Sequence, residues 1–384
     1  MARQTSYIFS GKQINRLIFR SAAMYMKRYE RTNHRTKAKA GEKIAVSPSD
    51  GHRISQFAQR VIAPLAKLMD WSAIQIVATM NTEDSNPRLE EAIQFMNGPD
   101  FLPAESQPAQ VEFNGPLHFH FPTPRPCDCP ENNVVHGRFY RCPGRWQERP
   151  VIILMHGWGD FYSYKLRFRL LARRCNRAGF NAIALAAPGH FQRRPPRRGA
   201  WDSGDCLLLA ERTAQAIAEI RALTGWLLAE GCPAVALWGY SMGAWHAGMA
   251  ACRDARLAAV VLVSPPEGRL RPWVHQGAVR PALRATLQQA QAVCQGLNRT
   301  PLNLTTTQPI IPRQNILFIE GVHDIICSKD GGEALWQTWR QPDIWRLPHG
   351  HVGVCCGFAP GLPGRVLRWL EPRLNNAATR TQNK

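Results

Sequence analysis

One serine of the sequence stands in a setting that could make it a nucleophile. Ser241 is the centre of the pentapeptide Gly239–Gly243 (GYSMG), which follows the apolar run Ala234–Trp238 and opens a helical pattern ending at Cys252. A serine hydroxyl attacks a carbonyl carbon only when it is exposed beside a base, and a sharp strand-to-helix turn gives that exposure. Glycines two residues to either side remove side chains that would collide in the turn. The pattern predicts acyl transfer through a covalent intermediate on Ser241.

Acyl transfer also needs backbone N–H groups aimed at the oxygen that becomes negatively charged. The apolar run Val151–Met155 leads into the loop HGWGD at positions 156–160, whose glycines let the backbone approach a substrate closely. One donor follows the nucleophile and the other comes from such a loop, so we expect the N–H groups of Met242 and Trp158 to form the oxyanion hole. His156 is interpreted as a structural residue that anchors the loop.

A carboxylate should follow the nucleophile along the chain and precede the base. The predicted strand Ile316–Ile319 leads to Asp324, which stands just beyond the strand end. Glu320 is its rival, but that residue still belongs to the strand end. Asp330 is placed to cap the next helix. We therefore predict that Asp324 orients the base.

The base should be a histidine that follows this acid. The strand predicted at Ile344–Leu347 leads to His349 and His351, and both follow Asp324 in the required order. A histidine after a glycine in the loop behind the last strand is the commoner arrangement, which favours His351 and leaves His349 open. The base would take the proton of Ser241.

The elements around these residues alternate between strand and helix from Val151 onward. Continuous apolar runs indicate strands that are covered on both faces, and intervening helical patterns indicate parallel connections. The sequence therefore predicts an α/β fold with a doubly wound, mostly parallel sheet. Strands are expected at Leu117–Phe121, Val134–Tyr140, Val151–Met155, Asn181–Leu185, Ala234–Trp238, Ala259–Val263, Ile316–Ile319 and Ile344–Leu347; helices at Lys165–Ala178, Asp205–Glu230, 241–252, Gly332–Trp339 and Arg365–Leu370.

Three regions lack the regular alternation of strand and helix patterns that predicts the main domain at 111–375. One precedes this domain, one is inserted in it and one follows it. Residues 1–110 form a basic, mainly helical extension, with an amphipathic pattern at Gln13–Tyr29 that indicates either a docked helix or an arm for a membrane surface or partner. The stretch at about 266–312 is too long for a simple connection and is predicted to be a lid. Residues 376–384 are expected to form a polar tail.

The net charge of the sequence indicates possible partners, and its cysteine count indicates a cellular location. The formal charge is +20, with basic residues concentrated near the start of the chain, in Arg193–Arg198 and in the predicted lid. Such charge fits a solvated surface, an anionic membrane, an acidic or lipid-like substrate, or nucleic acid, although no nucleic-acid module is recognisable. An odd count of 11 cysteines, and no secretory or membrane-spanning segment, favour a soluble, cytoplasmic protein. Oligomeric state is left open.

A local group of histidines and cysteines raises the alternative of a zinc site. Zinc sites usually have two to four residues between paired cysteines, whereas one residue separates Cys127 from Cys129. The spacing therefore favours a plain loop. The group comprises His118, His120, Cys127, Cys129, His136 and Cys142.

Taken together, these motifs resemble the successive signature loops of the α/β-hydrolase superfamily. The similarity covers about residues 111–375 and is strongest to the branch of the α/β-hydrolase domain-containing protein 18. The resemblance implies a serine hydrolase without a cofactor. This chain departs from many members at Ala186 and Ala187, where an acidic residue often precedes Pro-Gly-His, and at Ala244, where a second glycine often stands. The motifs are HGWGD, AAPGH, WGYSMG, GVHD and HGHVG.

The expected function is hydrolysis of a carboxylic ester, or alternatively of a thioester or amide, through an acyl-enzyme on Ser241. A different class remains open, because the fold also carries binding proteins and acyltransferases. Such a protein could act at an anionic surface. The acyl group and the leaving group are not determined by the sequence.

Overall fold

The computed structural model describes most of the chain's second compact unit. The described residues are 63–64, 66–71, 73, 88–103, 105–160, 162–194, 205–266, 298–327, 329–356, 359 and 361–382. The two compact units are Met1–Leu65 and Ala66–Lys384, and the sheet and the candidate site belong to the second. The helix predicted at Gln13–Tyr29 and most of the predicted lid lie outside the described residues.

One mixed sheet of nine strands runs through the described part of this unit. Its order is β1-β2-β3-β5-β4-β6-β7-β8-β9, with antiparallel pairing from β1 to β5 and parallel pairing from β5 to β9. The predicted doubly wound, mostly parallel sheet is therefore confirmed. The strands are β1 (Glu112–Asn114), β2 (His118–Pro122), β3 (Val134–Tyr140), β4 (Val151–Met155), β5 (Asn181–Leu185), β6 (Val235–Tyr240), β7 (Leu257–Val263), β8 (Ile316–Gly321) and β9 (Asp343–Leu347).

The central strands are buried on both faces, which explains their continuous apolar sequences. Successive side chains of a strand point to opposite faces, so Ile153 and Met155 join one core cluster while Ile152 and Leu154 join the other. All residues of β4, β5, β6 and β7 are buried. The carboxyl ends of the parallel strands meet at one edge of the sheet, where ligands bind in open α/β sheets.

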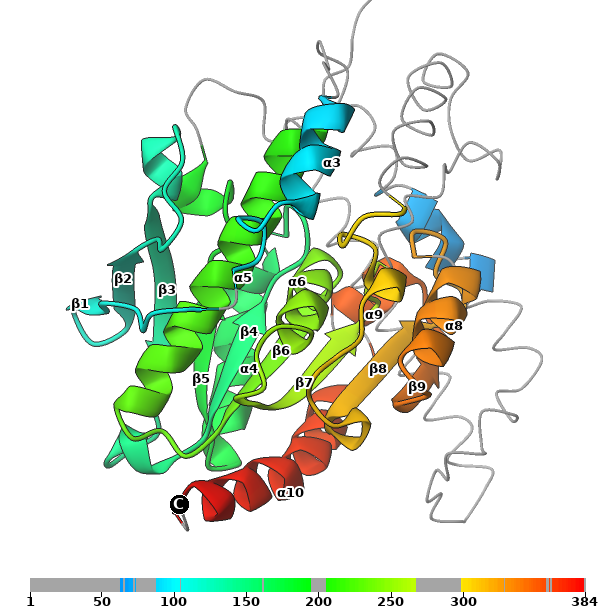
Figure 1. The fold of residues 1–384 in the computed structure, drawn as a ribbon. Coiled ribbons are helices and arrows are strands. Elements are labelled where there is room, and N and C mark those ends of the chain that lie inside the picture. Colours follow the sequence, from blue (N-terminus) through cyan, green and yellow to red (C-terminus); the bar gives the residue numbers. More distant parts are fainter. Residues whose placement is uncertain are drawn as a thin grey trace, which may run out of the picture. The chain divides into compact units, whose positions relative to one another are not determined.

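Helices cover both faces of the sheet (Figure 1). One core cluster takes side chains from α3, α5, α6 and α8, and the other from α4, α9 and α10. The side chain of Asp205 caps the longest of these helices, α5, by accepting from the N–H groups of Leu207 and Leu208. The helices are α3 (Leu89–Asn97), α4 (Phe168–Arg177), α5 (Cys206–Ala229), α6 (Met242–Ala251), α8 (Lys329–Thr338), α9 (His351–Cys355) and α10 (Leu362–Gln382).

Three details differ from the expected elements. The edge strand β1 is three exposed residues and carries no alternating pattern that could have predicted it. A π-helical turn at Ser163–Arg167 precedes α4 and overlaps the start of the helix expected at Lys165–Ala178. Helix α10 runs to Gln382 and thus takes in residues of the predicted polar tail. None of the helices in the described ranges combines the length and apolarity needed to cross a membrane.

A buried ion pair joins the 3-10 turn after β5 to α5. Arg193 and Glu219 are 0% and 1% exposed, and two guanidinium nitrogens of Arg193 donate to the two carboxylate oxygens, at 2.7 and 2.5 Å. Glu219 also accepts from the hydroxyl of Thr123 at 2.7 Å, and Arg193 donates to the carbonyl of Asn132 at 2.7 Å. Arg193 therefore does not add to a basic surface, although the sequence groups it with its basic neighbours.

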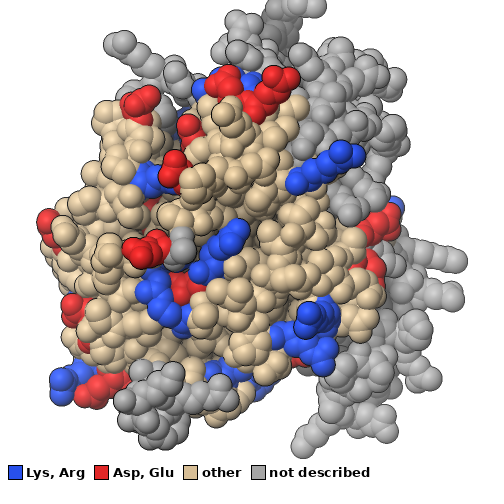
Figure 2. All heavy atoms as spheres, in the orientation of Figure 1, with Lys and Arg blue, Asp and Glu red and all other residues tan. Residues whose placement is uncertain are grey.

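Basic and acidic side chains alternate on the face of the molecule that Figure 2 shows. The blue and red groups of the described residues on this face are separated by larger uncharged areas. Mixed charge of this kind is typical of a solvated surface. The excess of positive charge in the whole sequence is therefore not displayed as one block on this face.

Candidate active site

Ser241 lies at the turn between β6 and α6, where the backbone is strained. Its φ is +52° and its ψ is −118°, a conformation that residues with a side chain rarely adopt. The turn is held by a hydrogen bond from the N–H of Ser241 to the carbonyl of Val263, at 2.8 Å. The side chain is thereby presented at the carboxyl edge of the sheet.

The two glycines of the pentapeptide are required by the closeness of this turn. A Cβ atom on Gly239 would lie 2.2 Å from the carbonyl oxygen of Gly243. A Cβ on Gly243 would lie 2.5 Å from the carbonyl oxygen of Met155, on the neighbouring strand β4. Both distances are far below van der Waals contact, so any larger residue would displace Ser241 from its position.

Three side chains from three separate segments of the chain form a hydrogen-bonded relay. Nε2 of His351 lies 2.9 Å from the hydroxyl oxygen of Ser241, and Nδ1 of His351 lies 2.8 Å from Oδ2 of Asp324. A neutral imidazole with its proton on Nδ1 donates to the carboxylate and accepts from the hydroxyl. The relay therefore has the geometry in which His351 can take the proton of Ser241.

The structure also places the two rival residues. His349 is buried, and burial, with the nearby His323, lowers its pKa to about 4, so its imidazole is neutral. Its carbonyl accepts from the N–H of His323, at 3.0 Å. Glu320 forms an ion pair with Arg346 at 3.6 Å. In both cases it is the other candidate, His351 or Asp324, that joins the hydrogen-bonded relay.

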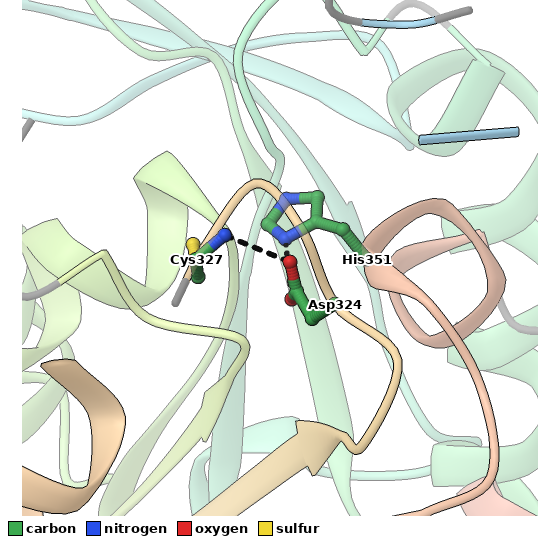
Figure 3. Close-up of side chains that lie close together, drawn as sticks. All are labelled: Asp324, Cys327 and His351. Carbon is green, nitrogen blue, oxygen red and sulfur yellow. Dashed lines mark hydrogen bonds and ion pairs between the residues drawn. The ribbon is translucent and has the colours of Figure 1, made fainter. Parts of the chain in front are cut away.

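Asp324 is fixed by its own loop (Figure 3). Its Oδ1 accepts from the N–H groups of Ile326 and Cys327, at 2.9 and 2.7 Å, which leaves Oδ2 for His351. Asp324, Cys327 and His351 also form a group close enough to share a metal ion, the one such group among the described residues. The carboxylate of Asp324 and the imidazole of His351 already take part in the hydrogen bonds described above. The histidines and cysteines weighed above as a zinc site form no such group in the described chain.

The electrostatic environment keeps His351 basic. Burial acts to lower the pKa of His351, but the negative charge of Asp324, with contributions from Cys355 and Cys327 and the hydrogen bond to Asp324, raises that pKa well above 6.5. An acidic partner favours the protonated imidazole, which is the form needed after a proton has been taken from serine.

The loop of Trp158 lies against the turn of Ser241. A Cβ on Gly157 would be 3.4 Å from Cβ of Ser241, so the loop backbone reaches the serine directly. Met242 is the first residue of α6, where helix N–H groups have no partner within the helix. The two predicted oxyanion donors thus belong to the two backbone segments that flank the Ser241 hydroxyl.

His156 anchors this loop. Its Nδ1 lies 2.8 Å from the carbonyl of Gly157, and its Nε2 accepts from the N–H of Ala187 at 3.1 Å. Burial lowers the pKa of His156 to about 4, so both bonds are made by a neutral ring. The geometry is that of the structural histidine expected from the sequence.

Sequence reasoning missed one residue, Asp70. It lies in a short helical segment at 66–71, belongs to the same compact unit as the relay and is completely buried. Its carboxylate accepts from the backbone N–H groups of His351 at 2.8 Å, Val352 at 2.9 Å and Ile325 at 3.3 Å. No motif surrounds Asp70, and nothing in its local sequence distinguishes it from a helix-end carboxylate.

The sheet order and the serine turn after β6 define an α/β-hydrolase fold. Residues 72–291 match the family described as α/β hydrolase domain containing 18, and the match covers more than half of the chain. The chain belongs to the α/β hydrolase domain containing 18 family. The matched residues include Ser241 and Trp158 and end before Asp324.

Curated relatives and solved structures of similar fold extend this comparison. Two uncharacterized proteins of Mycobacterium tuberculosis, from strains CDC 1551 / Oshkosh and ATCC 25618 / H37Rv, are 26% identical over 237 residues, which cover 58% of this chain and 54% of theirs. The chain thus spans about half the length of the curated relatives it matches. An esterase of Pyrococcus furiosus is 17% identical, with a TM-score of 0.45 over 70% of this chain and 98% of its own. A monoacylglycerol lipase of Paleococcus ferrophilus is 18% identical, with a TM-score of 0.44 over 62% of this chain and 99% of its own.

Proposed function

We propose that the protein is a serine hydrolase that cleaves a carboxylic ester, with a thioester or amide as the alternative substrate class. The observation that carries this proposal is the hydrogen-bonded relay of Asp324, His351 and Ser241, with distances of 2.8 and 2.9 Å. A strained nucleophile turn and a fully bonded carboxylate would have no evident use in a protein that only binds.

The relay can carry both halves of an acyl transfer. As the oxygen of Ser241 attacks the ester carbonyl carbon, Nε2 of His351 takes the serine proton. The negative charge on the carbonyl oxygen is stabilised by the N–H groups of Trp158 and Met242. Collapse of the tetrahedral intermediate breaks the bond to the leaving alcohol, which receives the proton from His351. Water then attacks the acyl carbon and gives a proton to His351; the bond to Oγ of Ser241 breaks, the carboxylic acid leaves, and Oγ receives the proton from His351.

A fluorophosphonate probe tests the nucleophile directly. We expect wild-type protein to form a covalent adduct on Ser241, identified by peptide mass spectrometry, and Ser241→Ala to form none. Ser106→Ala is a matched control, because Ser106 is half-buried in the segment before the edge strand β1, whereas Ser241 follows the central strand β6; it should label like the wild type. Unlabelled wild type, or equal labelling of Ser241→Ala, would overturn the proposed function and favour a binding role.

The pH dependence of hydrolysis should reflect His351. The base must be neutral to accept a proton, and the negative charge of Asp324 holds the pKa of His351 well above 6.5. We therefore expect kcat/KM for a neutral ester to rise with pH through a midpoint above 6.5. The measurement is a pH–rate profile at constant ionic strength. A profile that is already flat from pH 5 upward would show that His351 is not the base.

A further inference from the structure

Asp70 joins the two loops that carry the acid and the base of the relay. Its Oδ2 accepts from the N–H of His351 at 2.8 Å and from that of Ile325, the residue after Asp324, at 3.3 Å. Its Oδ1 accepts from the N–H of Val352 at 2.9 Å. One buried carboxylate therefore sets the distance between the loop after β8 and the start of α9.

The loop of His351 is shaped to receive this carboxylate. A Cβ on Gly350 would lie 2.6 Å from Oδ2 of Asp70 and 2.9 Å from its Oδ1 and its carboxyl carbon. The backbone of Gly350 has φ −85° and ψ −178°, an extended conformation that any residue can adopt. The absence of a side chain at Gly350 is thus explained by the closeness of Asp70 and by no backbone requirement.

The carboxylate also lies within electrostatic reach of the relay. Burial and the charge of Asp324 raise the pKa of Asp70 to about 6, while the charge of His351 and hydrogen bonds from Val352 and His351 lower it. Such coupling is reciprocal, so an ionised Asp70 favours protonated His351. The titratable groups that face His351 are Asp70, Asp324, Cys327, Cys355 and Cys356.

We propose that Asp70 is a positioning residue of the hydrolase: its carboxylate holds the acid loop and the base loop in register and adds a second negative charge behind His351. The proposal rests on the proposed function. It places part of the active-site support outside residues 111–375, in a segment more than 250 residues from either loop in sequence.

The first test compares Asp70→Asn with a matched control. Asparagine has the same shape but brings an NH2 group toward three N–H donors and removes the charge. We expect the fluorophosphonate labelling rate of Asp70→Asn to fall about 10- to 100-fold because the relay loops shift. The control is Asp254→Asn. Asp254 is also buried and pairs with Arg256 at 2.7 Å. It precedes β7 and so lies at the amino end of the parallel strands, whereas Ser241 lies at their carboxyl end. It should label at the wild-type rate.

The second test separates positioning and charge from simple loss of stability. The proton on Nδ1 of His351 should give a far-downfield proton NMR signal, assigned by its loss in His351→Gln. Removing the charge of Asp70 should lower the pH midpoint of that signal by about half a unit or more. The midpoint in Asp254→Asn should equal that of the wild type. This readout needs no turnover and remains decisive even if no substrate or probe reacts.

A double-mutant cycle tests whether Gly350 lacks a side chain because the carboxylate of Asp70 occupies that space. Gly350→Ala should slow labelling about tenfold in the wild type, because the new methyl group displaces the carboxylate. In the Asp70→Ala background the same change should alter the rate less than about twofold, because the obstacle is gone.

The outcomes distinguish the two proposals. Wild type that does not label refutes the proposed function, and the NMR midpoints then decide the role of Asp70. If wild type labels and Asp70→Asn labels equally fast with an unmoved midpoint, Asp70 is not a positioning residue. Additive effects in the cycle, or equal losses in Asp70→Asn and Asp254→Asn, would contradict the proposal as well.

Discussion

Replacing Asp324 with asparagine is expected to lower kcat for ester hydrolysis about 10⁴-fold. The amide can donate a hydrogen bond to Nδ1 of His351, which would place the ring proton on Nε2 and remove the acceptor for the Ser241 proton. It also removes the charge that keeps the pKa of His351 well above 6.5. The measurement is kcat with a neutral aryl ester, together with a pH–rate profile whose midpoint should move to lower pH.

If Asp324 acts only through the relay, its substitution should have no further effect once Ser241 is removed. The double variant Ser241→Ala/Asp324→Asn should be no slower than Ser241→Ala alone, because without the hydroxyl there is no proton for the relay to move. A further multiplicative loss in the double variant would mean that Asp324 contributes through folding. A loss of less than about tenfold in Asp324→Asn would contradict its role as the orienting acid.

Replacing Glu219 with glutamine is expected to lower the free energy of unfolding by about 3–5 kcal/mol. Glutamine keeps the shape of the side chain but leaves the guanidinium of Arg193, which is 0% exposed, without a compensating charge. An unpaired buried charge is among the most destabilising changes that one substitution can make. Urea unfolding followed by tryptophan fluorescence measures the change.

Two comparisons show whether the burial of the ion pair causes the expected loss of stability in Glu219→Gln. Glu148 pairs with Arg145 at 3.4 Å, but these side chains are 65% and 81% exposed, so Glu148→Gln should change nothing measurable. The double variant Arg193→Met/Glu219→Leu removes both charges and should recover much of the lost stability. Equal effects of Glu219→Gln and Glu148→Gln would refute this account of the buried pair.

The sequence predicts the fold well because its strongest signals are local. Val151–Met155 and Asn181–Leu185 are continuous apolar runs whose observed bounds equal the predicted ones. The turn of Ser241 is recognisable because it requires two glycines: Gly239, which packs against the backbone of Gly243, and Gly243, which packs against the end of β4. The assigned roles of Ser241, Asp324 and His351 stay predictions, although the structure brings the three together as the sequence order implies.

What the sequence does not reveal depends on contacts between distant segments. His349 and His351 have similar local surroundings, and only the packing of the loop decides which ring meets Asp324. Asp70 is less visible still, because its three partners are backbone N–H groups, which have no residue-specific signal. A boundary drawn near residue 110 from texture alone separates Asp70 from the loops it contacts.

The span between Asp70 and His351 also has a consequence for biosynthesis. These residues are 281 positions apart, and Ile325 is 255 positions from Asp70. A chain emerging from the ribosome presents Asp70 at least 255 residues before its partners. Closing so long a loop is slow and comes after local elements have formed. The nascent polypeptide should therefore stay unreactive until the segment of His351 has emerged and Asp70 can bind it.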